Sequence, residues 1–307
     1  GVRYRDSGGA TVATARAEVI LAAGAINSPK LLELSGIGDG ALLGRHGIEV
    51  IHDNKSVGEN LQDHLQIRTV YRLRNAKTLN TLANSFWGKA RIALQYALTQ
   101  SGPMSMAPSQ FGMFTKSDPV LATPDLEYHV QPLSTDRLGD PLHPFPAITV
   151  SVCNLRPESR GHVHIQASDS ATHPEISPNY LSAGRDRQVA VAAVRQARQI
   201  MTAKALTPHS PEEFLPGRDV QTEDELLKSV GDIATTIFHP VGTCRMGADD
   251  EAVIDPRLRV KGLDGLRIVD ASIMPKIVSG NTASPVIMIA EKAADMIVKD
   301  SAAGLAG

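Results

Sequence analysis

The same pattern, a short apolar stretch followed by a loop and an amphipathic helix, occurs near both ends of the chain. At the start, the apolar run 19–23 leads into residues 27–36, which offer an N-cap, a proline in the first turn and a glycine stop. At the end, the strand-like run 265–270 leads into a helix that begins at Ser284. Short apolar runs of this kind are typical of buried parallel strands, so we expect the two ends to build one α/β domain.

The region between the two ends has a different pattern. Segments that alternate apolar and polar residues predict strands with one buried face, and they are separated by long helical stretches such as 185–206. Thr222 and Glu225 have capping-box spacing, which predicts a helix start there. The predicted fold class is therefore α/β plus α+β, with a discontinuous, partial Rossmann-like domain and an inserted domain of antiparallel sheet and helices.

Composition restricts the class of protein. A chain of 307 residues with net charge −2 can form two domains, and its 4% aromatic content gives no base-stacking surface, so we expect no nucleic-acid partner. Cys153 and Cys244 cannot form a disulfide framework, which favours a reducing compartment. No apolar run approaches the roughly 20 residues that span a bilayer. We therefore expect a soluble, cytoplasmic protein without a membrane span.

The motif HPVGTCRMG (239–247) is the strongest candidate for chemistry. His239 and Cys244 have no second ligand pair at comparable spacing, so we expect no metal. Cys244 lies in what reads as a buried turn and is better explained as a small packed residue than as a nucleophile. There is no G-x-S-x-G elbow for a serine hydrolase. A catalytic base and a packing histidine remain, and Pro240 and Gly242 shape a turn that lets a flat ligand come close.

A second candidate is the stretch SGNTASP, residues 279–285. Gly280 and Asn281 precede a helix N-terminus, whose free N–H groups and dipole favour a negatively charged ligand. A plain loop with an N-cap accounts for the same residues, and the pattern alone leaves both interpretations open.

Residues 24–38, GAINSPKLLELSGIG, resemble at each fixed position the second signature of the glucose-methanol-choline (GMC) oxidoreductases. Other segments are similar to the family in the family's order, namely 57–64, 155–165, HPVGTCRMG and 258–297. The chain is therefore identified as resembling a choline dehydrogenase-like GMC oxidoreductase over nearly its whole length.

The resemblance implies an FAD enzyme that oxidises a primary alcohol to the aldehyde by hydride transfer to flavin N5. His239 takes the position of the family's proton acceptor, and Asn281 that of the second active-site residue. A histidine with an ordinary pKa near about 6.5 can accept the hydroxyl proton at neutral pH. An asparagine amide can only hold the alcohol oxygen, so we expect His239 to be the base and Asn281 the orienting group.

The resemblance also implies the domains and the cofactor contacts. Residues 1–64 and 239–307 would be the two parts of the FAD-binding domain, the second with the active-site loops, and residues 65–238 the substrate-binding domain. The helix at Ser284 would direct its N-terminus at the flavin, which favours negative charge on the reduced ring. The residues expected at the cofactor are Asp270, Ala271, Thr282, Asn281, Gly24 and Asn27.

The sequence departs from the family in one respect. The G-x-G-x-x-G fingerprint that binds the ADP part of FAD is absent, and SGIGDG (35–40) imitates it only weakly. We interpret the chain as the C-terminal portion of a GMC oxidoreductase. Two alternatives remain: a GMC-fold lyase or decarboxylase, and a catalytically silent fragment that cannot hold FAD alone.

The substrate is less constrained than the cofactor. Phe238 precedes the base and is the expected substrate contact, but Trp87 is the only tryptophan and no full aromatic cage for a quaternary ammonium is evident. A primary aliphatic or aryl alcohol is therefore favoured. The electron acceptor, oxygen or a quinone, and the oligomeric state, a homo-oligomer included, are left open by the residues.

Overall fold

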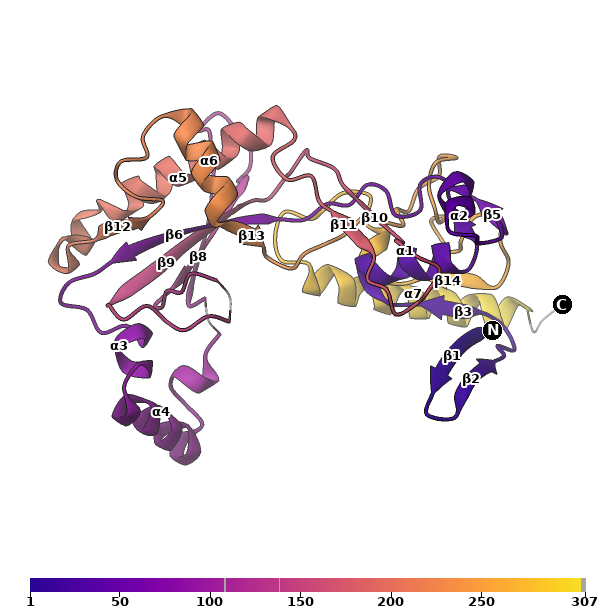
Figure 1. Ribbon diagram of the computed structural model, residues 1–307, viewed down its shortest axis with the longest axis horizontal. Coiled ribbons are helices and arrows are strands. Elements are labelled where there is room, and N and C mark those ends of the chain that lie inside the picture. The colour runs from indigo at the N-terminus through magenta and orange to yellow at the C-terminus, as the bar shows by residue number, and fades with distance from the viewer. Residues whose placement is uncertain (108, 138, 305–307) are drawn as a thin grey trace. The chain divides into compact units, whose positions relative to one another are not determined.

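The computed structural model describes residues 1–107, 109–137 and 139–304 (Figure 1). The chain divides into two compact units. Unit 1 consists of Gly1–Asp63, Pro157–Ser182 and Phe238–Gly307, and unit 2 of His64–Arg156 and Ala183–Ile237. None of the helices in the described part of the chain combines the length and the apolar character that a membrane crossing requires.

The centre of unit 1 joins the two ends of the chain. Strand β3 (Val19–Leu21) pairs in parallel with β14 (Leu266–Ile268), with Val19 opposite Leu266. Helix α1 (Gly24–Leu34) follows β3, and the 3-10 turn η3 (Ala271–Ile273) follows β14 and leads to α7 (Ala283–Gly304). The expected α/β domain built from both chain ends is confirmed.

Smaller elements complete unit 1. They are the antiparallel hairpin β1 (Val2–Asp6) and β2 (Gly9–Ala13), the parallel pair β4 (Ile37–Gly38) and β5 (His52–Asp53), α2 (Gly40–Arg45), and the antiparallel pair β10 (His162–His164) and β11 (Glu175–Ser177).

Residues 157–182 lie in unit 1, whereas the sequence pattern assigns them to the central domain. The reason is a set of contacts with the N-terminal segment. Gly161 and Leu61 exchange backbone hydrogen bonds of 2.9 and 2.8 Å. The fully buried carboxylate of Glu33 in α1 accepts from the His164 ring at 2.7 Å and from the Ile165 N–H at 2.8 Å.

Unit 2 is built on a six-stranded antiparallel sheet, which confirms the expected architecture of the inserted region. The strand order is β12-β6-β9-β8-β7, and β13 also pairs with β6. The strands are β6 (Leu65–Arg72), β7 (Phe111–Thr115), β8 (Leu126–Gln131), β9 (Ala147–Asn154), β12 (Glu212–Leu215) and β13 (Ala234–Thr236). The other elements are α3 (Leu79–Ala83), α4 (Phe86–Thr99), η1 (Pro103–Ser105), α5 (Gly184–Met201), η2 (Lys204–His209) and α6 (Glu223–Ile233).

Helices α5 and α6 lie on the same side of this sheet (Figure 1). Tyr128 of β8 donates its hydroxyl to the Ala193 carbonyl of α5 at 2.8 Å, so Tyr128 and its neighbour Val152 on β9 face the helices. Successive side chains of a strand point to opposite faces. Ser151 and Cys153 therefore share the face turned away from α5.

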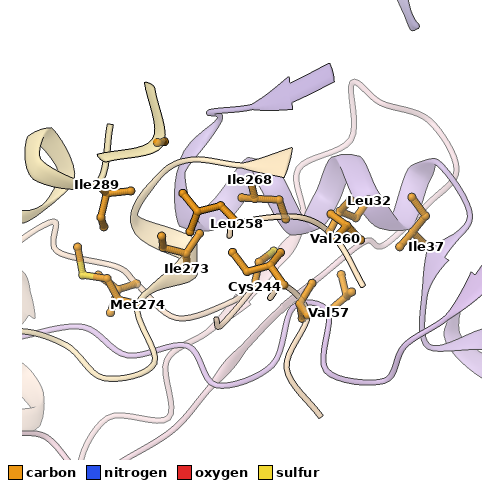
Figure 2. Packing of buried hydrophobic residues seen from close by; sticks show 14 of the residues in the cluster. Leu32, Ile37, Val57, Cys244, Leu258, Val260, Ile268, Ile273, Met274 and Ile289 are labelled. Atoms are coloured by element: carbon orange, nitrogen blue, oxygen red, sulfur yellow. The ribbon is translucent and has the colours of Figure 1, made fainter. Parts of the chain in front are cut away.

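The core of unit 1 collects apolar side chains from distant parts of the sequence. Figure 2 shows Leu32 of α1, Ile268 of β14, Cys244 and Ile289 of α7 as members of one cluster, with Ile289 near Met274 at its left end. Cys244 is a free, fully buried cysteine, and its burial raises the pKa of the thiol far above its ordinary value. The expectation that Cys244 is a packed residue and not a nucleophile agrees with this setting.

Candidate functional site

All the site residues expected from the sequence lie in unit 1, and the HPVGTC loop (239–244) contacts the turn after β14. The loop is fixed on two sides by its backbone. Val241 exchanges hydrogen bonds of 3.0 and 2.9 Å with Gln62, while Gly242 and Cys244 donate to the carbonyls of Ala271 and Ser272 at 3.3 and 2.9 Å. The loop position is therefore set by main-chain contacts.

Gly242 permits this close packing. Its φ is +96°, and a Cβ at this position would lie 2.6 Å from the Asn60 carbonyl oxygen. Any L side chain would meet both backbone strain and a backbone atom that cannot rotate away. Glycine is thus required for the turn that carries the histidine.

His239 begins the loop and is 9% exposed. Its N–H donates to Asp63 Oδ1 at 2.9 Å, and the Tyr180 hydroxyl donates to the other oxygen of Asp63. Asp63 therefore fixes the backbone of the candidate base. The preceding residue, Phe238, has φ +64° and a side chain that is 68% exposed.

Gln62 connects the histidine loop with the loop before α7. Its backbone pairs with Val241, its side-chain amide donates to the Pro275 carbonyl at 3.2 Å, and its side-chain oxygen accepts from the Ile277 N–H at 3.1 Å. Gln62 is 2% exposed. The roles of Gln62, Asp63 and Tyr180 were not predicted from the sequence, although the first two residues lie within the family-like segment 57–64.

Asp270 fixes a second junction. Its carboxylate accepts from the Gly24 N–H at 3.0 Å, from Ser28 Oγ at 2.5 Å and from the Ser272 N–H at 2.8 Å. The start of α1 and the turn after β14 are therefore joined by one buried side chain. Both carboxylate oxygens of Asp270 therefore accept hydrogen bonds from other residues of the chain. The carbonyl of the next residue, Ala271, accepts the hydrogen bond from Gly242 in the histidine loop.

The remaining expected residues differ in exposure. Asn27 in α1 and Asn281 before α7 are exposed, and Thr282 is 8% exposed and accepts the Val286 N–H at 3.1 Å to start α7. Gly24 has φ +80°, and no atom lies within 4 Å of the place that a Cβ would occupy. The structure thus joins the loop of His239 to Ala271 through Gly242, and joins Asp270 to Gly24. Asn281 and Thr282 follow the segment 275–277, which Gln62 holds.

Residues in this arrangement fit a flat, partly anionic cofactor. The open space at Gly24 admits a ring or a phosphate close to the backbone. The 22-residue helix α7 presents its N-terminal N–H groups beside Thr282, where a negative charge is stabilised.

A second group of polar side chains lies in unit 2 and was not found from the sequence. Glu127, His129 and Cys153 each have a ligand atom within 4.8 Å of the others. His129 Nε2 lies 3.4 Å from Glu127 Oε1. The strand register explains their proximity, because Glu127 is directly opposite Cys153.

Comparison with known proteins identifies the family. The family models described as GMC oxidoreductase match residues 1–66 and 157–290. The chain belongs to the GMC oxidoreductases. It is 41% identical to an alcohol dehydrogenase [acceptor] of Pseudomonas putida over 92% of this chain and 51% of the relative. It is also 41% identical to an oxygen-dependent choline dehydrogenase of Escherichia coli over 95% of this chain and 52% of the relative.

Solved structures agree with this assignment. A formate oxidase of Aspergillus oryzae aligns with a TM-score of 0.91 at 27% identity and covers 98% of this chain and 57% of its own. The pyridoxine 4-oxidase structure aligns with a TM-score of 0.81 at 29% identity, covering 95% of this chain and 53% of its own. This GMC oxidoreductase chain spans about half the length of the relatives that it matches.

Proposed function

We propose that the protein containing this chain oxidises a primary alcohol to the aldehyde with FAD as the hydride acceptor, and that His239 is the base. The observation that carries the proposal is that hydrogen bonds hold the backbone and the loop of His239. Its backbone is held by Asp63 and its loop by Gln62 and Ala271, so the imidazole starts from a fixed position. A positioned base suits proton removal from an alcohol.

FAD, when bound, supplies the hydride-accepting atom N5 of its ring. Unit 1 supplies the residues that hold it. Gly24, Asn27, Ala271 and Thr282 are the proposed contacts, and the N-terminus of α7 stabilises negative charge on the ring. Asp270 shapes this site by holding Gly24 and Ser272 in place.

Two side chains act on the alcohol. His239 accepts the hydroxyl proton, and the Asn281 amide donates a hydrogen bond to the same oxygen. Removing the proton increases the electron density at the carbon that gives up hydride, so the two events assist each other. The exposed ring of Phe238 is the proposed apolar contact for the rest of the alcohol. Oxygen or a quinone would then reoxidise the flavin.

The test is anaerobic reduction of the flavin in the full-length protein. A primary alcohol should bleach the flavin absorbance without oxygen, and His239→Ala should lower the reduction rate by about 10² or more. His173→Ala is the matched control, because His173 is exposed and lies in the same unit. An unchanged reduction rate in His239→Ala would show that His239 is not the base.

A further inference from the structure

Strand β6 has two partners on one edge, and a gap separates them. β12 pairs with Val70–Arg72 and β13 with Leu65–Ile67. Arg68 therefore lies in the unpaired part of this edge, between the two partner strands. A cavity of about 470 Å³ opens at this place. It is lined by Arg68, Leu215, Thr235, Asp136, Arg137 and Asp232, all from unit 2.

The Arg68 side chain is suited to binding an anion. Arg68 is 6% exposed, and its Nη2 is buried without a hydrogen-bond partner among the described residues. Among the described residues, no carboxylate forms a salt bridge with the Arg68 guanidinium. Burial lowers the pKa of Arg68, although a guanidinium keeps its charge at neutral pH. A buried, unpaired charge is costly, and a ligand that pairs with it recovers this cost.

Two further donors continue the row away from the cavity. Ser151 is directly opposite Arg68 on β9, and His129 is directly opposite Ser151 on β8. Ser151 Oγ is also buried and lacks a hydrogen-bond partner among the described residues, whereas His129 Nε2 lies 3.4 Å from Glu127 Oε1. Three neighbouring strands thus present a guanidinium, a hydroxyl and an imidazole on the sheet face turned away from α5.

The acidic side chains nearby do not neutralise Arg68. Asp136 lines the cavity, but its side chain is 75% exposed and pairs with His143 at 3.0 Å. Asp232 is exposed, and Glu127 pairs with His129. Exposed carboxylates are screened by water and affect a bound anion weakly.

We propose that Arg68 binds the carboxylate group of a small organic acid in this cavity. A planar guanidinium presents two parallel N–H groups that match the two oxygens of a carboxylate. All the residues of this carboxylate site lie in unit 2.

The site is tested first by calorimetric titration of the 307-residue chain with benzoate, with benzamide as the neutral match. Benzoate should bind at least about tenfold more tightly than benzamide, because a bidentate charged pair contributes on this scale. Arg68→Gln should abolish the difference. Arg91→Gln, which removes an exposed arginine of α4 in the same unit and changes the net charge equally, should keep it. Equal binding of benzoate and benzamide would overturn the site.

Thermal unfolding separates ligand binding from a structural role. Arg68→Gln removes a buried unpaired charge, so its melting temperature without ligand should equal or exceed that of the wild type. A clear loss of melting temperature would show that Arg68 has partners in the folded chain, and would contradict the proposal.

Discussion

The carboxylate of Asp63 holds the backbone of the candidate base, with an N–H to oxygen distance of 2.9 Å to His239. Asp63→Ala should lower the free energy of unfolding by about 1–3 kcal/mol, since it leaves a buried N–H of His239 without its acceptor. Tyr180→Phe removes only one donor to Asp63 and should cost less, about 0.5–1.5 kcal/mol. Urea unfolding followed by circular dichroism measures both. Wild-type stability in Asp63→Ala would show that the contact contributes nothing.

The candidate site was predicted from the sequence only where a local motif carries it. The stretch HPVGTCRMG left a base and a packing role open for His239, and its resemblance to the family motif favours the base; the histidine and the glycine turn that positions it lie within a few residues of each other. Tyr180 could not be found in this way. It lies 117 residues from its partner Asp63 in the sequence. No local sequence pattern around Tyr180 predicts a hydrogen bond to a carboxylate so far away.

At the level of elements, α1 and β10 are joined by an ion pair that depends on pH. Burial lowers the pKa of His164, but the hydrogen bonds and charges of Glu33 and Glu59 more than offset this, so its pKa is raised above the ordinary value. The folded pKa exceeds the unfolded pKa of about 6.5. The stabilisation is therefore fully present below about pH 6.5 and is lost as the pH rises through the folded pKa.

Urea unfolding at a series of pH values tests this pair. In wild type the free energy of unfolding should fall as the pH rises from about 6.5, and His164→Gln should show a shallower fall. His173→Gln, an exposed histidine of the same segment, should keep the wild-type slope. Identical slopes in His164→Gln and wild type would mean that the pair with Glu33 does not bias the protonation of His164.

The local signals at the starts of α6 and α7 were predicted well. Helix α1, in contrast, begins at Gly24, before the N-cap expected from residue 27 onward, and Pro29 lies inside it. Elements with distant partners were not predicted. The capping box of Thr222 and Glu225 is present at the start of α6, and α7 begins at Ala283, one residue before the expected Ser284. Strand β10 alternates polar and apolar residues like any strand of the central region. Its membership in unit 1 depends on a contact with the buried Glu33, which is 131 residues away from His164 in the sequence. The alternation of residues in β10 does not predict this contact.

At the scale of the whole molecule, the division into two units places one buried thiol in each. Cys244 lies in the core of unit 1 and Cys153 in the sheet of unit 2, and both are fully buried. Because only an exposed thiolate reacts quickly, neither cysteine should be alkylated in the native protein. Each thiol therefore reports the unfolding of its own unit. The sequence predicted two domains, but the thiols became unit-specific probes only once the structure had placed each in its own core.

A destabilised turn in unit 1 should move only one of these reporters. Gly242→Ala forces a side chain into φ +96° and against the Asn60 carbonyl, which costs about 1–3 kcal/mol from backbone strain alone. Pulse alkylation along a urea gradient, read by mass spectrometry of the two peptides, should shift the Cys244 midpoint to lower urea and leave that of Cys153 in place. Gly280→Ala meets no atom within 4 Å and should shift neither. If both midpoints move together in Gly242→Ala, the two cores unfold as one cooperative structure, and the contacts that define the units do not make them energetically independent.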